Sequence, residues 1–346
     1  MPDATYGYVR SLSSADLREV SLPILMMNAF HLMQKPGSTV INTLGGLHRM
    51  AAWSGLIMTD SGGFQAYSLI RQNAKFGSLG DKGIIFYPEA SSRKLLLTPE
   101  KSIQLQMSYG SDILVCLDDC THVNASRAEQ EASVTRTLAW AARAKSSYLA
   151  QLRSRKWSEE ECPLIFAVIQ GGGELDLRRR CAEGLLEIGF DGFGFGGWPL
   201  DEDSRLLTDI LEYTRSLIPR EFPIHALGIG HPAGIAASYQ LGYEMFDCAL
   251  PTRDARHGRL FTWSESDPIL SADGDWLKFR YINSEENFRD TGPISPDCDC
   301  ECCRDYAMAY LFHLYRMRDP GYMRLATKHN LRFMTRLIER LRAQNA

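Results

Sequence analysis

The sequence predicts a closed barrel of parallel strands and outer helices, the (β/α)8 type, followed by a small cysteine-rich subdomain. Short apolar runs alternate with helical patterns over most of the first 250 residues, which is typical of a parallel sheet with helices outside it. Four of the nine cysteines then crowd into residues 298–303, where the alternation has stopped. We therefore expect a barrel over residues 1–262, and over residues 263–346 a subdomain with one last, basic barrel helix.

Seven apolar runs have the length and composition of strands, one fewer than a closed barrel needs. The residues before the first run resemble a turn followed by a short helix at 14–19, which is what would follow a first strand. We therefore expect the first strand to be absent or shortened, so that the barrel is incomplete or closed in another way. An open doubly wound sheet is the alternative. The expected strands are 23–27, 55–59, 112–117, 164–169, 192–195, 224–228 and 245–250.

Helix start signals lie between these strands. Thr98 and Pro99 supply a cap and a first-turn proline. Ser126 and Glu129 form a capping-box pattern that opens a long helix towards residue 155. Further helices are expected at 174–188, 204–218 and 232–241. Two segments interrupt the alternation: residues 71–97 predict an inserted hairpin, and residues 261–296 predict an irregular polar connection.

Composition and charge limit the class of protein. No apolar run is long enough to span a bilayer, and the N-terminus lacks the hydrophobic stretch of a secretory signal, so we expect a cytoplasmic protein without a membrane partner. The net charge is −4, but residues 304–346 hold nine Lys and Arg against three Asp and Glu, which is +6 and leaves −10 for the rest. This asymmetry indicates a local basic face, although a solvated amphipathic helix gives the same count.

Acidic and amide side chains follow the ends of several expected strands. Asp60, Asp118 and Asp247 each close or follow an apolar run, and Gln170 follows another. A lone Asp can pair with a nearby arginine, and an Asp at a strand end is often the cap of the next helix. We interpret Asp119 as such a cap, or as a residue that supports the site from behind. In a barrel, however, the strand ends meet at one mouth. Gathered carboxylates repel one another and survive mainly where chemistry uses them.

Three carboxylates at one mouth fit the transfer of a sugar. Two around one anomeric carbon are the pattern of retaining glycosyl transfer, in which one attacks and the other handles protons. A third can accept two hydrogen bonds from a guanine edge. The glycines after other strands would let a flat base approach the backbone, and Gln170 could then bind the carbonyl of the base. A purine N-glycoside is therefore favoured over a polysaccharide.

The cysteine cluster predicts a metal site. Crowded cysteines in a reducing compartment bind metal more often than they form disulfides. Tetrahedral zinc needs four ligands, and the cluster C-x-C-x2-C supplies three, so the fourth must come from elsewhere. A closed site of four protein ligands would be structural. The candidates are Cys298, Cys300 and either Cys302 or Cys303, with His313 or His329 as the fourth ligand.

Three motifs together resemble one known family. TDSGGFQ at residues 59–65, FDCALPTR at 246–253, and CDCECC at 298–303 followed by KHN at 328–330 are similar to motifs of the tRNA-guanine transglycosylase family, in order over nearly the whole chain. The resemblance implies a (β/α)8 barrel with a zinc subdomain near the C-terminus. It also implies a pentosyltransferase that exchanges the wobble guanine of GUN-anticodon tRNAs for a 7-deazaguanine, either queuine or its precursor.

The resemblance also implies roles for individual residues. Asp247 resembles the nucleophile that forms a covalent intermediate with the ribose, and Asp60 resembles the general acid or base. The zinc ligands would be Cys298, Cys300, Cys303 and His329.

The remaining implied contacts concern the base, the RNA and a second subunit. Family members commonly form homodimers, so a homodimer is expected. The anticodon loop would be held by Arg253 and Arg256, with His231 nearby. The residues expected to hold the base are Ser61, Phe64, Asp118, Cys120, Gln170, Gly196, Gly197, Leu227 and Gly228.

The chain also departs from the family pattern. The usual N-terminal segment, with most of the first strand, is missing, and Asp119 stands where bacterial members have Glu. Trp198 and Pro199 follow the glycine pair where smaller or aliphatic residues are common, and His231 stands where Lys is common. These changes leave the incoming base open. Two alternatives therefore remain: a relative that acts on DNA or prefers another base, and a non-catalytic tRNA-binding partner subunit.

Overall fold

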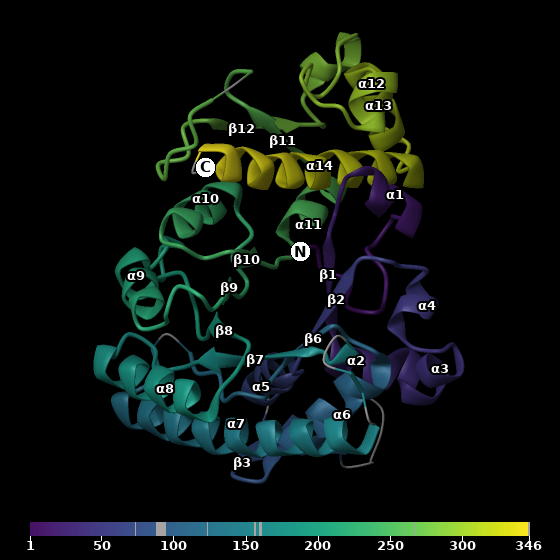
Figure 1. The fold of residues 1–346 in the computed structure, drawn as a ribbon. Helices are drawn as coiled ribbons and strands as arrows, with labels where there is room; N and C mark the ends of the chain where they lie inside the picture. Colours follow the sequence, from purple (N-terminus) through teal and green to yellow (C-terminus); the bar gives the residue numbers. More distant parts are fainter. Residues whose placement is uncertain are drawn as a thin grey trace.

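The computed structural model describes residues 1–72, 74–87, 95–122, 124–155, 157–158, 161–266 and 268–344. Seven parallel strands form one sheet in the order β1-β2-β6-β7-β8-β9-β10. Figure 1 shows this sheet curled into a ring with helices on its outer side. The strands are β1 Ile24–Asn28, β2 Leu56–Asp60, β6 Ile113–Val115, β7 Leu164–Ile169, β8 Gly192–Phe195, β9 Ile224–Ala226 and β10 Met245–Phe246.

The N-terminal residues close the ring between β10 and β1. Pro2 pairs in parallel with Cys248, just after β10, and Asp3 pairs in parallel with Met26 in β1. The backbone N–H of Ala4 donates to the carbonyl of Met26 at 2.7 Å, and Figure 1 shows the N-terminus beside β1, β10 and α11 (Leu250–Arg256). The fold is therefore a (β/α)8-type barrel whose first strand is reduced to two residues. The expectation of a shortened first strand is confirmed.

Helices cover the outside of the ring in the order that strand–helix alternation predicts. The Thr98 side chain accepts a hydrogen bond from the N–H of Lys101 at the start of α6. Glu129 accepts from the N–H of Ser126 at 2.7 Å at the start of α7. The helices before and around the barrel are α1 Ser14–Glu19, α2 Ala29–Leu32, α3 Ser38–Thr43, α4 Leu47–Ala51, α5 Gly63–Gln72, α6 Pro99–Tyr109, α7 Arg127–Arg155, α8 Leu175–Ile188, α9 Thr208–Ser216 and α10 Pro232–Gln240.

The inserted segment forms a small sheet of its own. Strands β3 (Gly77–Gly80), β4 (Gly83–Phe86) and β5 (Leu95–Leu97) pair antiparallel in that order. The predicted hairpin is thus present with a third strand added. Residues 73 and 88–94 of the predicted segment lie outside the described residues.

One prediction around the last barrel strand is wrong. The strand expected at 245–250 ends at Phe246, and the residues from Leu250 to Arg256 form the helix α11. Pro251 lies in the first turn of α11, where its fixed φ suits a helix and its missing N–H costs nothing. Arg253 and Arg256 therefore lie in the last turn of a helix.

The segment after α11 is more regular than predicted. Strand β11 (Arg259–Trp263) pairs antiparallel with β12 (Leu277–Tyr281), although the sequence predicted irregular structure from residue 261. The ring of Trp263 stacks on Phe333 with centroids 4.1 Å apart. This packing joins residues 70 positions apart, which a local pattern cannot reveal. The helices that follow are α12 Glu301–Asp305, α13 Met308–Arg316 and α14 Pro320–Gln344. In Figure 1, α14 lies between the barrel and the subdomain formed by β11, β12, α12 and α13.

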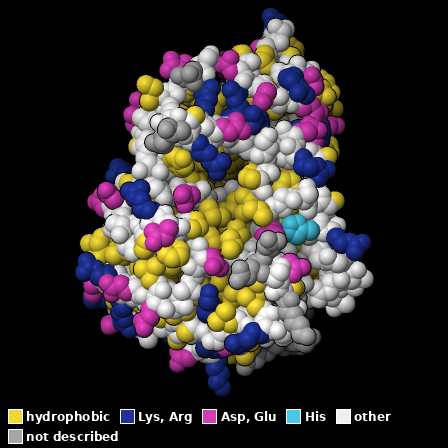
Figure 2. Space-filling model, in the orientation of Figure 1, with side chains coloured by type: hydrophobic (Ala, Val, Ile, Leu, Met, Phe, Trp, Pro, Cys, Tyr) yellow, Lys and Arg dark blue, Asp and Glu magenta, His cyan; other side chains and the backbone are white. Residues whose placement is uncertain are grey.

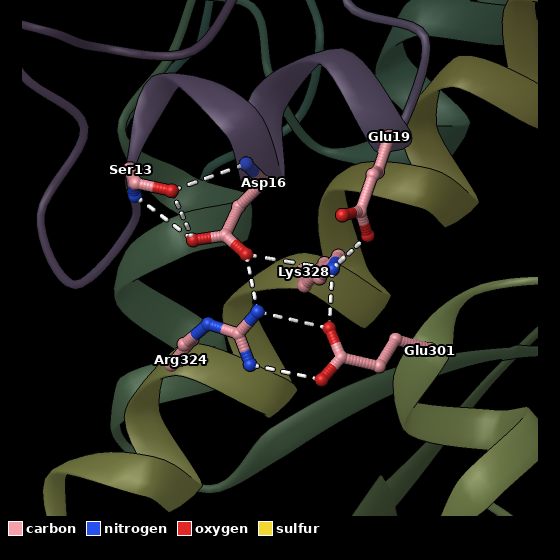
Figure 3. Close-up of polar contacts among 6 residues, drawn as sticks. All are labelled: Ser13, Asp16, Glu19, Glu301, Arg324 and Lys328. Carbon is pink, nitrogen blue, oxygen red and sulfur yellow. Dashed lines mark hydrogen bonds and ion pairs between the residues drawn. The ribbon is translucent and has the colours of Figure 1, made fainter.

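The basic side chains of α14 are used mainly inside the protein. Figure 3 shows Lys328, of which 1% is exposed, among Asp16, Glu19 and Glu301, and Arg324 between Asp16 and Glu301. This cluster joins α1, α12 and α14. Further along α14, Arg332 forms ion pairs with Asp299 and Glu339. Arg336 donates to the carbonyl of Asp297, and Arg340 donates to the carbonyl of Ser266. These cations of α14 therefore bind residues of the same chain, most of them in other segments.

Among the described helices, none combines the length and the apolar character needed to cross a membrane. All nine cysteines are free thiols.

Candidate active site

A cavity of about 490 Å³ lies where the barrel strands end. Its lining comes from the ends of all seven strands of the sheet and from the N-terminal residues Asp3 and Thr5. Figure 2, in the same orientation as Figure 1, shows hydrophobic side chains gathered around the centre of the ring. The cavity lining includes each residue expected from the sequence to act in catalysis or base binding: Asp60, Ser61, Phe64, Asp118, Cys120, Gln170, Gly196, Gly197, Leu227, Gly228 and Asp247.

Asp247 follows β10 and is held by two donors. Nε2 of His225 lies 2.8 Å from its Oδ1, and the N–H of Gly228 donates to the same oxygen at 3.1 Å. Burial opposes ionisation of Asp247, but the bonds from His225 and Gly228 outweigh it and hold the pKa of this carboxyl below its usual value. Gly228 has a φ of +75°, which a residue with a side chain rarely adopts. Asp247 is thus prepared to stay ionised.

Asp60 ends β2 and has the opposite tendency. Burial is the largest influence and raises its pKa to about 7, with a smaller contribution from the charge of Asp247. The N–H of Gly62 and the side chain of Asn28 donate to its two oxygens at 3.0 and 2.7 Å and oppose this rise. A carboxyl with a pKa near neutrality can both release and accept a proton at the pH of the cell. Two carboxyls in one cavity with pKa values pushed apart are a pattern of acid–base and nucleophile pairs.

A third carboxyl, that of Asp118 after β6, also lines the cavity. Asp118 accepts a hydrogen bond from Nε2 of Gln170 at 2.6 Å, and burial raises its pKa to about 6. The Oε1 of Gln170 is buried and has no hydrogen-bond partner in the structure. An unpaired buried acceptor is costly, so this oxygen fits a ligand that supplies an N–H. Asp119 instead forms an ion pair with Arg136. It lies eight residues before the start of α7 at Arg127, so the expectation that it caps the next helix is wrong.

Buried Arg178 on α8 supports the glycine loops of the cavity. Its guanidinium donates to the carbonyls of Ile169, Gly172 and Gly196 at 3.1, 2.8 and 3.0 Å, and it lies 4.2 Å from the ring centroid of Phe195. These bonds tie the end of β7 to the end of β8. The backbone beside Gly196 is thereby held at a fixed place in the cavity wall.

Aromatic side chains lie at the rim of the cavity. The ring of Phe64, 44% exposed, lies 5.9 Å from that of Trp198, 42% exposed. His122 approaches Trp198 from the opposite loop at 5.7 Å. Exposed rings at a cavity rim offer stacking surfaces for nucleobases.

The three residues expected to contact RNA lie outside the cavity lining. Arg253 is exposed, and Arg256 on the same helix has a buried Nη1 without a hydrogen-bond partner. Both are on α11, which begins three residues after Asp247. His231 is the N-cap residue of α10, and its ring centroid lies 6.0 Å from that of Phe279.

The cysteine cluster and α14 form a candidate metal site. Ligand atoms of Cys298, Cys300, Cys303 and His329 all lie within 4.8 Å of one another. Nε2 of His329 lies 2.8 Å from the carbonyl oxygen of Phe261, which leaves Nδ1 free for a metal and is a common outer-shell contact of metal ligands. Three thiolates and one imidazole fit structural zinc. Both choices that spacing left open are decided here, because Cys302 and His313 are outside the group.

Comparison with known proteins identifies the family. The family model described as "Queuine tRNA-ribosyltransferase" matches residues 1–344. The chain belongs to the queuine tRNA-ribosyltransferase family. It is 35% identical over 342 residues to the queuine tRNA-ribosyltransferase of Psychrobacter sp. (strain PRwf-1), covering 99% of this chain and 84% of the relative. Relatives of the same name from Solidesulfovibrio magneticus and Lysinibacillus sphaericus are 37% and 36% identical, with 99% of this chain and 85% and 83% of theirs covered.

The family resemblance drawn from the three motifs is therefore confirmed, and the queuine tRNA-ribosyltransferase family is one of pentosyltransferases. Sequence reasoning missed three residues that touch the predicted carboxyls or support their loops. His225 lies inside the predicted strand 224–228, and Asn28 directly follows the predicted strand 23–27. Arg178 lies inside the predicted helix 174–188. A polar residue in an apolar strand run was the only local signal for His225 and Asn28, and Arg178 looked like an ordinary helix cation.

Proposed function

We propose that this chain exchanges the wobble guanine of GUN-anticodon tRNAs for a 7-deazaguanine, by double displacement through a covalent bond between Asp247 and the ribose. The observation that carries the proposal is the pair of carboxyls in one cavity with opposite pKa shifts. Asp247 is held ionised by two hydrogen bonds, and Asp60 has a pKa of about 7. These are the states that a nucleophile and a proton carrier need. The names of the relatives support the tRNA substrate.

In this proposal the base is held between the other walls of the cavity. Asp118 accepts hydrogen bonds from the N–H groups of the guanine edge. Gln170 completes recognition, either by accepting at its unpaired Oε1 or by donating from Nε2 to the carbonyl of the base. Phe64 stacks on the base from the rim. Gly196 and Gly197 let the base approach the backbone, and Gly228 does the same on the far side. The remaining contacts proposed for the base are those of Ser61, Cys120 and Leu227.

The RNA is proposed to lie across α11, where Arg253 and Arg256 bind the anticodon loop. Arginine suits both phosphate and base contacts because its planar group can pair or stack, and the target base must leave its stack before chemistry. A bound Zn²⁺ would tie α12 to α14 and would take no part in the chemistry. His231 is proposed as a secondary RNA contact, and a homodimer in the cytoplasm as the working form.

Two other functions stay open. Trp198 and Pro199 line the cavity, at positions where the resemblance implies small or aliphatic residues in bacterial members. This difference favours a relative with another base preference or one that acts on DNA. A non-catalytic partner subunit would still bind tRNA. Retention of both carboxyls in one cavity speaks against the non-catalytic reading.

One experiment separates these functions. The protein is incubated with labelled guanine and a tRNA bearing a GUN anticodon, beside Asp247→Asn and an equivalent DNA hairpin. We expect label in the tRNA with the wild-type protein only, and an RNA–protein adduct on a denaturing gel that the variant does not form. Binding without exchange would favour the partner subunit, and label in DNA would favour the DNA-acting relative. Size-exclusion chromatography with light scattering tests the dimer.

A further inference from the structure

The buried side chain of His225 lies directly behind the carboxylate of Asp247. Only 1% of the His225 side chain is exposed, against 22% for Asp247, so the imidazole is beneath the carboxylate and the carboxylate faces the cavity. Nε2 is 2.8 Å from Oδ1, and the N–H of Gly228 reaches the same oxygen. Among the hydrogen bonds of the described residues, none reaches Oδ2. The two oxygens of Asp247 are therefore not equivalent.

The barrel itself keeps this arrangement in place. His225 is the register partner of Met245 in the parallel pairing of β9 with β10, and Asp247 follows two residues later. The titratable groups near Asp247 are Asp60 in the same cavity lining, His225 beneath the carboxylate, the adjacent Cys248 and the terminal amine of Met1. Because a carboxylate oxygen can only accept, Nε2 of His225 carries the hydrogen of this bond.

We infer that His225 is a positioning residue, which makes Oδ2 the attacking atom of Asp247 and stabilises the charge that returns to Oδ1 when the covalent intermediate is cleaved. The inference rests on the proposed function. In the first displacement an electron pair of Oδ2 bonds to C1′ of the ribose while the C1′–N9 bond breaks, and the departing guanine takes its proton from Asp60. Oδ1 is then the carbonyl oxygen of the ester.

The second displacement reverses these events with the incoming base. A ring nitrogen of that base bonds to C1′ and gives its proton to Asp60, while the electron pair of the C1′–Oδ2 bond returns to the carboxylate. The negative charge that reappears is shared by Oδ1, where His225 and Gly228 already donate. Fixed donors at the atom where charge develops lower the barrier. His225 transfers no proton in either step.

The test compares His225→Met, which removes the donor, with His225→Gln, whose Nε2 can take the place of the ring nitrogen. The chain contains a matched control in His48, whose Nε2 lies 3.0 Å from Asp112 Oδ2, away from the cavity lining. We expect His225→Met to lower kcat about tenfold or more, since loss of one such donor typically costs about 10²–10³. The KM for tRNA should stay within about twofold, and the RNA adduct should persist longer after a chase with unlabelled base.

Two further readouts separate positioning from a general loss of structure. The acid limb of the pH–rate profile should move to higher pH in His225→Met, because the pKa of Asp247 loses a bond that lowers it. His225→Gln should restore most of the rate and the adduct lifetime, and His48→Gln should change neither.

Wild-type rates, adduct lifetime and acid limb in a folded His225→Met would overturn the inference and leave the proposed function intact. If His225→Met does not fold, His225→Phe takes its place, and equal adduct lifetimes in that variant and the wild type would overturn it in the same way. Exchange by Asp247→Asn would instead refute the proposed function.

Discussion

Asn28 and Asp60 are register partners in β1 and β2, and the amide of Asn28 donates to Oδ2 of Asp60 at 2.7 Å. Each residue ends its strand, so the hydrogen bond joins two adjacent strand ends at the mouth of the barrel. Burial raises the pKa of Asp60 to about 7, and the bond from Asn28 opposes that rise. The pairing of two strands therefore adjusts the proton affinity of the proposed acid–base residue.

Asn28→Ala should move the basic limb of the exchange reaction to higher pH. The variant removes a hydrogen bond that favours the ionised form, so the pKa of Asp60 rises above about 7. If Asp60 must be protonated to donate to the leaving guanine, activity then persists to higher pH. The measurement is kcat/KM for guanine exchange between pH 6 and 9, with the exposed Asn42→Ala as control. A limb that stays in place, or moves down, would refute this role for Asn28.

Asp60→Asn should be inactive yet more stable than the wild type at high pH. A folded pKa near 7 against 3.8 means that ionised Asp60 destabilises the native state. The effect is absent below pH 4, grows as pH rises towards 7 and is complete above it, with an upper limit of about 4 kcal/mol. Urea unfolding at pH 4.5 and pH 8 measures it. Asp203→Asn, on the surface with 71% exposure, should show no such dependence, and a variant with equal gain at both pH values would contradict the reading.

Removal of the metal should lower the stability of the subdomain around α12 and α14 and leave the arrangement of Asp60 and Asp247 unchanged. A chelator or Cys300→Ser should release about one zinc ion per chain and lower the melting temperature, because a structural site contributes its binding energy to folding. Metal content by atomic absorption and a thermal scan check this. Cys302→Ala is the matched variant from the same cluster, since Cys302 is outside the ligand group. Loss of zinc from Cys302→Ala with retention in Cys300→Ser would reverse the ligand assignment.

Lys328→Met should destabilise the chain by about 3 kcal/mol. The side chain of Lys328 is 1% exposed and contacts Asp16, Glu19 and Glu301. Without it these three carboxylates share less positive charge, because of the three Arg324 pairs with Asp16 and Glu301 only. Denaturant unfolding measures the loss. The control is Arg127→Met, which breaks ion pairs on the surface and should have a much smaller effect. Equal losses of unfolding free energy in the two variants would show that the cluster in Figure 3 contributes no more to stability than surface ion pairs do.

Strand–helix alternation was sufficient to predict the barrel because each strand is a short apolar run between helix start signals. The elements that this alternation did not predict have physical causes. Residues 1–4 have no strand composition, yet Pro2 and Asp3 pair with residues after β10 and in β1. Strand β11 is stabilised by packing of Trp263 on Phe333, and the cations of α14 meet carboxylates from α1 and α12. In each case the deciding partner is distant in sequence.

The candidate site divides in the same way. The sequence by itself determined the family, the chemical types at the strand ends and the cysteine cluster, because these depend on short motifs. Only the tertiary structure decided which oxygen of Asp247 is free, that Asn28 and His225 contact the two carboxyls, and that His329 rather than His313 joins the cysteines. Proton affinity and ligand geometry depend on burial and on distances of a few ångströms, and those exist only after the strands have taken their register.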